Sequence, residues 1–477
     1  MKMRKTKEPL LLHEVTIESA AAEGKAVAHS EGMVIFVPFV VPGDVVDIAV
    51  YKRKKNYAEG RAVALLKPSP LRVEAQCPHF GTCGGCKWQT TNYTAQLQAK
   101  EQQVKDTLER LGHVRTDSMR PICGADATFY YRNKLEFTFS TREWRDTPPS
   151  DTEEHPRCGA LGFHAPTVFD KVIDIRHCAL QHTLSNNIRN EVRQYAQQHG
   201  LAFYDIRNHS GYLRNLVVRN TEAGEWMVIV VVAEPDTTAL FPLLEHLKNQ
   251  FPQISSLQYI VNTKLNDSYS DLDVVLYHGT SCITEHMEGY DGAPALSYSI
   301  NPKSFYQTNS RQARKLYSFV AEMAELQSSD TLYDLYTGTG TIALFLAHMC
   351  KKVVGVEYVE EAVADARLNA QLNHIDNATF VAGDMAQVLT DSFVQTHGRP
   401  DIVVTDPPRA GMHAKVIEQL LQCSPRKIIY VSCNPATQAR DLELLGERYD
   451  VQRLQPVDMF PHTQHVENVA ELVLRNQ

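Results

Sequence analysis

The sequence has no long uninterrupted run of apolar residues, so no segment of it is suited to span a lipid bilayer. Lys2, Arg4 and Lys5 are not followed by an apolar stretch, which argues against a secretory signal peptide. The chain also lacks an overall basic excess: its net charge is −8, so no global positive field indicates nucleic-acid binding. With 477 residues, we expect a globular cytoplasmic protein of several domains.

Charge is distributed unevenly along the chain. Residues 1–67 contain 11 Lys and Arg against 8 Asp and Glu, a net of +3, which leaves −11 for the remainder. Short strands are expected at 34–37, 45–50 and 61–66. This pattern predicts a small antiparallel β-barrel over residues 1–68, and the stretch resembles a TRAM domain, which is an OB-like RNA-binding barrel. The basic loop 52–55 either contacts RNA phosphates or is a solvated hairpin tip, and charge alone leaves both open.

Ten cysteines in a cytosolic chain are more readily explained as ligands, nucleophiles or buried thiols than as disulfides. Cys77, Cys83 and Cys86 follow a C-x5-C-x2-C spacing with glycines among them, which is typical of a thiolate-bound centre. An iron–sulfur cubane or a tetrahedral zinc takes four such ligands, so a distant fourth cysteine is needed. The candidates are Cys178, which is favoured, and its rivals Cys123 and Cys158. Spacing alone does not separate iron–sulfur from zinc.

Residues 69–290 are predicted to form a central α/β domain. A helix is expected over 94–112, with packing against the C-terminal domain as one option. Basic and aromatic residues over 130–139 predict a strand that either stacks on unpaired RNA bases or is simply half-buried. The polar segment 142–158 is interpreted as a surface insertion.

The C-terminal part repeats a strand–loop–helix pattern. Its first strand leads into a G-x-G turn at Gly338 and Gly340, and its second ends at Glu357, where a carboxylate can accept from both ribose hydroxyls. The third strand precedes Asp384, which can accept from an adenine amine. This order predicts a Rossmann-like, class I S-adenosylmethionine-dependent methyltransferase over residues 291–477. NAD is the weaker alternative, because the third glycine of G-x-G-x-x-G is absent.

Two further strand ends carry reactive groups. The Asp-Pro-Pro-Arg segment 406–409 lacks the aromatic residue that amine methyltransferases usually place after the prolines. Cys433 follows the next strand in a Ser-Cys-Asn-Pro turn, a poor site for packing a buried thiol. A thiolate added to C6 of uracil makes C5 nucleophilic, and a base must then remove the C5 proton. Cys433 is therefore the predicted nucleophile and Glu467 the predicted base, although an ordinary exposed acid remains the alternative for Glu467.

Together these segments resemble the RNA 5-methyluridine methyltransferases, particularly the iron–sulfur, TRAM-bearing branch that acts on 23S ribosomal RNA. The resemblance rests on Cys77/Cys83/Cys86 with Cys178, Phe305–Asn309, Asp334–Gly340, Asp406–Arg409, Ser432–Pro435 and His465–Glu467. It implies a [4Fe–4S] cluster on those four cysteines, S-adenosylmethionine as methyl donor, Cys433 as nucleophile and Glu467 as proton acceptor. Contacts to the methyl donor are implied at Gln307, Tyr336, Gly338, Thr341, Glu357, Asp384 and Asp406.

Two alternatives remain open. The same chemistry could be directed at transfer RNA, as in the branch of the family that lacks the cysteine cluster. The second alternative belongs to a different functional class: a non-catalytic iron–sulfur RNA-binding protein that retains a methyltransferase fold. The sequence indicates neither a membrane nor an obligate protein partner.

Overall fold

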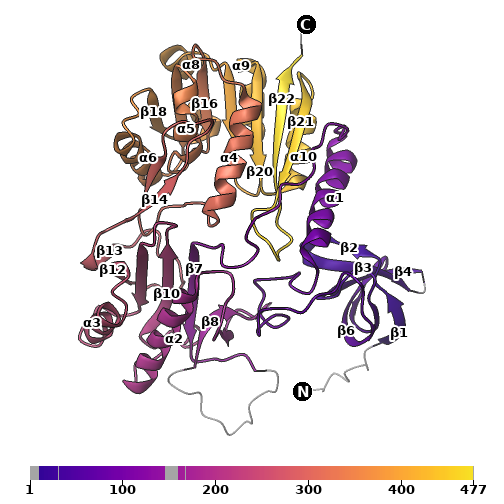
Figure 1. Ribbon diagram of the computed structural model, residues 1–477, viewed down its shortest axis with the longest axis vertical. Coiled ribbons are helices and arrows are strands. Elements are labelled where there is room, and N and C mark those ends of the chain that lie inside the picture. Colours follow the sequence, from indigo (N-terminus) through magenta and orange to yellow (C-terminus); the bar gives the residue numbers. More distant parts are fainter. Residues whose placement is uncertain (1–9, 31, 146–158, 167, 476–477) are drawn as a thin grey trace.

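The computed structural model describes residues 10–30, 32–145, 159–166 and 168–475, which form three large sheets with flanking helices (Figure 1). The N-terminal sheet has the strand order β1-β5-β6-β4-β3-β2 and curls around an apolar core. Its elements are β1 (Leu10–Thr16), β2 (Ser19–Ala20), η1 (Ala22–Gly24), β3 (Lys25–Ser30), β4 (Met33–Pro38), β5 (Val45–Arg53) and β6 (Tyr57–Lys67). Buried and exposed residues alternate along β4, because alternate side chains point to opposite faces.

The central sheet has the order β13-β12-β11-β10-β7-β8-β9, and two helices accompany it. All seven residues of β11 are buried, as the unbroken apolar run of this strand leads one to expect. The strands are β7 (Lys134–Ser140), β8 (Ala160–His164), β9 (Val172–Asp174), β10 (Leu213–Asn220), β11 (Trp226–Val232), β12 (Ile254–Val261) and β13 (Val274–Gly279). The helices are α2 (Thr183–Gln198) and α3 (Leu240–Gln250).

The C-terminal sheet has the order β18-β17-β16-β19-β20-β22-β21, and β22 runs antiparallel to both of its neighbours. Its strands are β16 (Thr331–Leu335), β17 (Lys352–Glu357), β18 (Ala378–Ala382), β19 (Ile402–Thr405), β20 (Lys427–Ser432), β21 (Tyr449–Val457) and β22 (Glu467–Leu474). The strand order reverses between β16 and β19. In open α/β sheets, ligands bind outside the carboxyl ends of the strands at such a point.

Helices cover both faces of this sheet, and a hairpin leads into it from the central sheet (Figure 1). The helices are α4 (Ser310–Ala324), α5 (Thr341–Leu346), η2 (Ala347–Met349), α6 (Glu360–Leu372), α7 (Met385–Val388), α8 (Asp391–His397), α9 (Ala414–Cys423) and α10 (Pro435–Leu445). The hairpin consists of β14 (Ile283–Met287) and β15 (Leu296–Ile300).

Helix α1 (Tyr93–Gly112) comes from the N-terminal part of the chain but packs against α10 of the C-terminal sheet. Asn92 caps its first turn by accepting a hydrogen bond from the Ala95 amide. Val104 and Leu108 are fully buried in the core of the C-terminal sheet. At the end of the helix, a Cβ on Gly112 would lie 2.7 Å from the carbonyl oxygen of Ala439, so only glycine allows this close approach.

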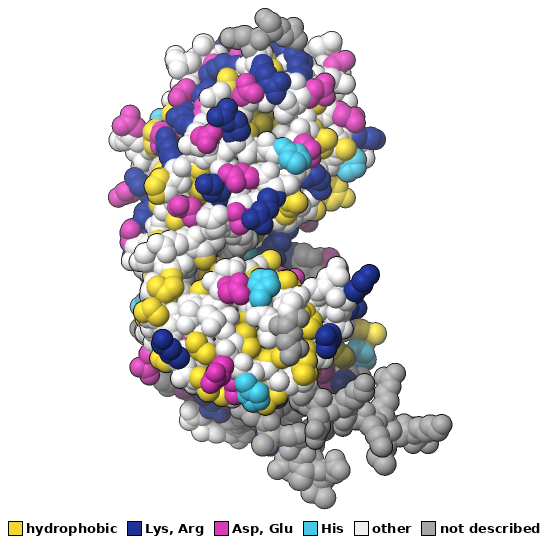
Figure 2. Space-filling view, turned by 90° about the vertical axis from the view of Figure 1, so that its right-hand side faces the viewer, with side chains coloured by type: hydrophobic (Ala, Val, Ile, Leu, Met, Phe, Trp, Pro, Cys, Tyr) yellow, Lys and Arg dark blue, Asp and Glu magenta, His cyan; other side chains and the backbone are white. Residues whose placement is uncertain are grey.

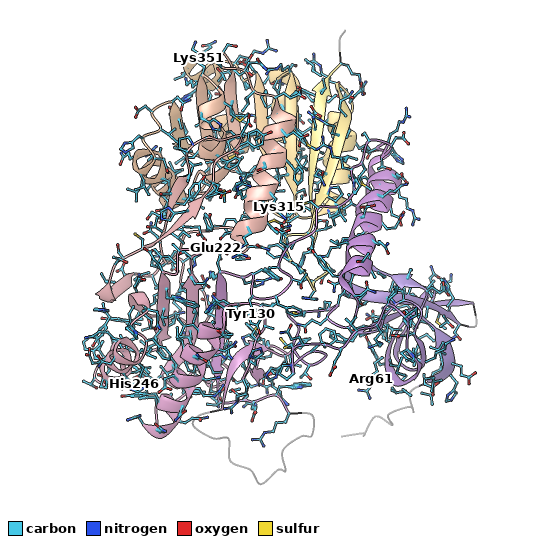
Figure 3. All side chains as sticks on the ribbon, viewed as in Figure 1. Arg61, Tyr130, Glu222, His246, Lys315 and Lys351 are labelled. Carbon is cyan, nitrogen blue, oxygen red and sulfur yellow. The ribbon has the colours of Figure 1, made fainter. Side chains whose placement is uncertain are left out.

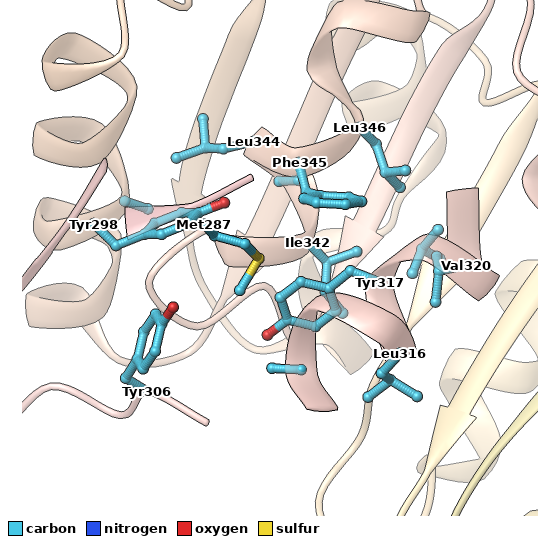
Figure 4. Packing of buried hydrophobic residues seen from close by; sticks show 14 of the residues in the cluster. Met287, Tyr298, Tyr306, Leu316, Tyr317, Val320, Ile342, Leu344, Phe345 and Leu346 are labelled. Carbon is cyan, nitrogen blue, oxygen red and sulfur yellow. The ribbon is translucent and has the colours of Figure 1, made fainter. Parts of the chain in front are cut away.

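A single apolar cluster joins strand β11 of the central sheet to the core of the C-terminal sheet. Figure 4 shows the part of it in which Tyr298 and Tyr317 pack around Ile342 and Phe345 of α5. At the surface of the same junction, Arg311 forms an ion pair of 2.7 Å with Glu222, which is labelled in Figure 3. The two sheets are therefore fastened to each other by packing as well as by charge.

Two expectations from the sequence need correction or qualification. The strand expected over 130–139 begins only at Lys134, because Tyr130 adopts a left-handed backbone (φ 56°) that ends any extended segment there. Most of the polar segment 142–158 lies outside the described residues. No helix in the described part of the chain is long and apolar enough to cross a membrane.

Candidate active site and cysteine-lined cavity

Cys433 and Glu467 lie side by side at the ends of two paired strands. Ser432, the last residue of β20, pairs with Asn468 of the antiparallel strand β22. Cys433, which follows Ser432, therefore lies opposite Glu467, which precedes Asn468. Asp406 follows β19, which pairs in parallel with β20, and its carboxyl group therefore emerges at the same edge of the sheet. A thiol and two carboxyl groups from three adjacent strands thus lie close together, and we call the region outside the carboxyl ends of these strands the crevice.

Burial dominates the electrostatics of this crevice. Glu467 is 6% exposed, and burial together with the neighbouring Asp406 raises its pKa to about 8. Burial also raises the pKa of Asp406 to about 7 and that of the Cys433 thiol to about 11, with Glu467 and Asp406 adding to the effect on Cys433. The guanidinium group of Arg409 acts in the opposite direction on Cys433 and Glu467. A cation in the crevice would therefore favour the anionic forms of both groups.

This pKa shift predicts that Glu467→Gln stabilises the ligand-free protein by on the order of 4 kcal/mol more at pH 9 than at pH 5. The folded carboxyl group keeps its proton up to about pH 8, whereas an unfolded glutamate loses it near about pH 4.3. The unfolded state therefore binds fewer protons between these values, and wild-type stability falls as pH rises through them. Glutamine has no proton to lose.

Thermal unfolding of wild type and variant at both pH values measures this effect. Glu418→Gln, at an exposed position on α9, is the matched control and should show no pH-dependent difference. Equal stabilisation by Glu467→Gln at both pH values would contradict the raised pKa.

The loop after Asp406 is held over Cys433 by the start of α10. The carbonyl oxygen of Arg409 accepts hydrogen bonds from Asn434 Nδ2 (3.0 Å) and Thr437 Oγ1 (3.2 Å). Arg440 donates to the carbonyl oxygens of Ala410 and Met412. These bonds keep the exposed Arg409 side chain close to the crevice, where its charge acts on the thiol.

The G-x-G turn after β16 forms an open cradle. Gly338 has a positive φ of 55°, and a Cβ added to it would meet nothing within 4 Å, so the backbone there borders free space. Glu357 Oε2 accepts from the Gly338 amide and Oε1 from the Val359 amide, both at 3.0 Å. Tyr336, at the start of the turn, also adopts a positive φ, of 63°. The predicted cradle residues are thus gathered at the carboxyl ends of β16 and β17.

The other residues implied in methyl-donor binding occupy different settings. Asp384 caps α7 by accepting from the Ala386 amide at 3.0 Å. The Thr341 hydroxyl is hydrogen-bonded to Tyr317 at 3.0 Å in the core shown in Figure 4, so its side chain already has a structural partner. The Gln307 carbonyl oxygen accepts from Asn133 Nδ2 of the central region at 2.9 Å.

Sequence reasoning missed a residue that supports the loop leading to Gln307. Arg219 of β10 is 4% exposed, and its guanidinium group donates to the carbonyl oxygens of Asn301 (2.7 Å) and Ser304 (2.6 Å). The available signal was weak: Arg219 directly follows the apolar residues Leu216, Val217 and Val218, and a buried guanidinium group must find acceptors.

Four cysteines from two distant segments line one cavity of about 210 Å³: Cys77, Cys83, Cys86 and Cys178. The side-chain amide of Asn186 holds the backbone of Cys178 in place. It accepts a hydrogen bond from the Cys178 N–H and donates one to the Cys178 carbonyl oxygen. His79 Nε2 accepts from the Arg176 amide at 3.1 Å, so that lone pair is occupied. Of the rival ligands, Cys123 does not line the cavity and Cys158 lies outside the described residues.

The predicted metal centre is not confirmed. Among the described residues, no three His, Cys, Asp or Glu side chains are grouped closely enough to hold a metal ion. The four thiols surround a space rather than converge on a point. Tetrahedral zinc, with Zn–S bonds of about 2.3 Å, requires such convergence, whereas a cubane binds each sulfur at a different iron. The cavity therefore suits a group of several atoms better than a single ion.

Comparison with known proteins gives the family. Residues 282–475 match the family described as tRNA (Uracil-5-)-methyltransferase, and residues 13–63 match the TRAM domain. Proteins described as uncharacterized RNA methyltransferases are similar along nearly their whole length. The one from Bacteroides thetaiotaomicron is 50% identical over 95% of this chain and 100% of its own. The one from Porphyromonas gingivalis is 51% identical over 96% of this chain and 99% of its own.

A solved structure is similar over the same extent. It is the crystal structure of Pyrococcus abyssi tRNA (uracil-54, C5)-methyltransferase in complex with S-adenosyl-L-homocysteine. Its sequence is 28% identical, its TM-score is 0.71, and the match covers 96% of this chain and 100% of that one. The N-terminal barrel and the Rossmann-like C-terminal sheet agree with these matches. The chain therefore belongs to the RNA uracil-5-methyltransferase family and is an RNA methyltransferase with an N-terminal TRAM domain.

Proposed function

We propose that the enzyme transfers a methyl group from S-adenosylmethionine to C5 of uridine in 23S ribosomal RNA, through a covalent adduct between Cys433 and C6. The observation that carries this proposal is the pairing of Cys433 with the buried Glu467 at adjoining strand ends. A nucleophile and a proton acceptor in one crevice are what C5 methylation requires, because a group attached at C6 must leave again after a C5 proton is removed.

The proposed reaction has three steps: addition of the thiolate, methyl transfer and removal of the C5 proton. The Cys433 thiolate forms a bond to C6 of uracil, and the C5–C6 π electrons move into an enolate. C5 then bonds to the methyl carbon, while the electrons of the broken sulfonium bond remain on sulfur. Glu467 takes the C5 proton, the C5–C6 double bond re-forms, and Cys433 leaves as a thiolate.

S-adenosylmethionine supplies an electrophilic methyl group and a positive charge when it is bound. In the ligand-free protein, burial keeps Cys433 and Glu467 largely protonated at neutral pH. A cation beside them lowers both pKa values, which favours the thiolate and the carboxylate that the chemistry needs. The chain's own residues therefore become competent once the donor site is filled.

The donor site is assigned to the cradle at Gly338. In this proposal Glu357 orients the ribose, Asp384 orients the adenine, and Tyr336 provides an aromatic wall. Gln307 and Asp406 are assigned further contacts to the donor. The free space over Gly338 supports this assignment, because a side chain at that position would fill the cradle. Thr341 is assigned a supporting role through its bond to Tyr317.

The choice of RNA rests on separate observations. Resemblance to the TRAM-bearing, cysteine-rich branch supports 23S ribosomal RNA. Transfer RNA is the second candidate, and the similar solved structure favours it, since that protein is named as a tRNA (uracil-54, C5)-methyltransferase. The barrel contributes basic side chains such as Lys52 and Arg53 to either target, and contacts to phosphate do not specify sequence. Charges of both signs are interspersed over the face in Figure 2, so local contacts must direct binding.

The test uses anaerobically purified enzyme, S-adenosylmethionine and 5-fluorouridine-substituted RNA on a denaturing gel. Fluorine at C5 cannot leave as a proton, so the adduct should persist as a shifted band. We expect this band with ribosomal RNA. A band with transfer RNA alone would change the substrate and keep the chemistry, whereas no band with either RNA would overturn the proposed function.

We further propose that Cys77, Cys83, Cys86 and Cys178 hold a [4Fe–4S] cluster in the cavity that they line. Four sulfur donors around a cavity of about 210 Å³ support this assignment. Such a cluster, when bound, would tie the 77–86 loop to the 178 segment. Iron and acid-labile sulfide analysis of anaerobically purified enzyme tests it, and a protein with neither would contradict it.

Cys86→Ser is expected to lower the melting temperature or to weaken RNA binding, while the chemical step of bound RNA proceeds at a wild-type rate. Neither Cys433 nor Glu467 lines the cavity, so its loss acts through structure rather than directly on the reacting groups. Cys423→Ser, at a half-buried cysteine at the end of α9, is the control. Unchanged stability and RNA affinity in Cys86→Ser would contradict a structural role.

A further inference from the structure

The nine-residue loop 458–466 connects β21 to β22 and ends at Glu467. In Figure 1 it projects from the C-terminal sheet toward the central part of the molecule. Five consecutive carbonyl oxygens of this loop accept hydrogen bonds from outside it. The donors are Gln312 Nε2 to Asp458 (2.9 Å), Asn309 Nδ2 to Met459 (3.0 Å), Lys100 Nζ to Phe460 (3.1 Å), Tyr131 OH to Pro461 (3.0 Å), and the Lys87 and Trp88 amides to His462 (2.8 and 3.1 Å).

The strongest of these anchors is a buried ion pair with α1. Lys100 Nζ lies 2.5 Å from Asp458 Oδ1, and both side chains are fully buried. Tyr93, about two turns before Lys100 on the same helix, donates its hydroxyl to Asp458 Oδ2 at 2.8 Å. The Phe460 amide also donates to Asp458 Oδ1. Buried ion pairs contribute little net stability because of their desolvation cost, so this pair is better explained by the geometry that it fixes.

A second contact fixes the middle of the loop. Gln96 of α1 donates through Nε2 to His462 Nδ1 (3.1 Å) and accepts from the His462 amide through Oε1 (2.9 Å). His462 itself adopts a left-handed backbone with a φ of 65°. Non-glycine residues hold such a conformation only where the surroundings enforce it.

We propose that α1 is a positioning element for the proton acceptor: Lys100, Tyr93 and Gln96 hold the 458–466 loop so that Glu467 faces Cys433. Glu467 is the terminal residue of β22, with a strand partner in Val457 on one side and this loop on the other. Strand ends fray unless the adjoining segment is held, and the α1 contacts hold it. The three α1 residues touch no reacting atom, so their role is to place one that does.

This inference rests on the proposed function and deepens it by assigning the contacts to one step. Cys433 and the donor cradle stand on β20, β16 and β17, and no hydrogen bond from Lys100, Tyr93 or Gln96 to these strands is among the described contacts. Addition to C6 and methyl transfer should therefore survive a loosened loop. Removal of the C5 proton should slow, because small displacements of a catalytic group are costly.

The experiment compares full-length Tyr93→Phe and Lys100→Met with wild type in single turnovers on uridine-containing RNA. Tyr93→Phe removes one hydroxyl and no charge, so it carries the test if Lys100→Met does not fold. The matched control is Tyr449→Phe, at a buried tyrosine on β21 of the C-terminal sheet. This change removes a hydroxyl that donates to the Pro425 carbonyl oxygen at 2.8 Å. Radiolabelled methyl groups on RNA that is still bound to protein in a denaturing gel report the adduct after methyl transfer.

We expect this methylated adduct to persist about 10-fold longer in Tyr93→Phe, with S-adenosylmethionine affinity within about 2-fold of wild type. A general loss of stability would instead reduce the active fraction without prolonging the adduct. Resolution at the wild-type rate in both variants, or equal prolongation in Tyr449→Phe, would overturn the inference. Failure of the wild type itself to methylate RNA would instead count against the proposed function.

Discussion

Cys433→Ala is expected to abolish methyl transfer to RNA while S-adenosylmethionine binds with nearly wild-type affinity. The thiol is the group that forms the bond to C6, and without that bond C5 of uracil is too weak a nucleophile to attack a methyl group. Loss of a nucleophile typically costs at least about 10⁴-fold in rate. The assigned donor contacts lie on other strands, at Gly338 and Glu357, and are left intact.

Transfer of radiolabelled methyl groups measures the rate, and calorimetry measures donor affinity. Cys282→Ala, at another half-buried cysteine outside the C-terminal sheet, is the control and should retain activity. Turnover by Cys433→Ala within about 10-fold of wild type would rule out an obligatory thiol adduct.

Glu467→Gln is expected to trap a covalent complex between the enzyme and RNA that contains ordinary uridine. Addition and methylation precede proton removal, so a variant without the acceptor should stop after both. Glutamine preserves the shape of the side chain and the neutral state that the buried carboxyl group holds in the ligand-free protein below about pH 8. The crevice should therefore still assemble.

A denaturing gel with radiolabelled methyl groups shows whether the trapped RNA is methylated. Adding Cys433→Ala to Glu467→Gln should remove the band, because the adduct then has no covalent link. Glu418→Gln is the control for the loss of a carboxylate elsewhere on the domain. Release of methylated RNA by Glu467→Gln at the wild-type rate would show that a group other than Glu467 accepts the proton.

Much of the architecture could be predicted from the sequence because parallel strand–helix repeats follow strict rules. Four strands can be identified from the sequence, and they lead to the G-x-G turn, Glu357, Asp406 and Cys433. The carboxyl ends of parallel strands meet at one edge of a sheet, so these four segments had to lie together. The short alternating strands near the start of the chain likewise predicted a barrel. Both expectations are confirmed by the fold and by the family matches.

The environment of individual side chains was less predictable. From the residues alone, an exposed acid is the favoured explanation of Glu467, yet the structure buries it between β21 and β20. The aromatic and basic segment near residue 130 suggested a longer strand than is formed, since backbone conformation at Tyr130 depends on contacts with the 179–181 segment. The cysteine spacing indicated four thiolate ligands, whereas the structure shows four thiols around a cavity.

The sequence by itself determined the class of the protein, its barrel and methyltransferase fold, and the residues expected to carry the chemistry. These follow from local patterns, namely strand periodicity, turn glycines and reactive residues at strand ends. Only the tertiary structure decided which distant segments support the site. Lys100 and Asp458 form a buried ion pair although 358 positions separate them, and no local pattern encodes such a contact. Long-range packing sets the burial, the pKa values and the position of Glu467, because these depend on every element packed around it.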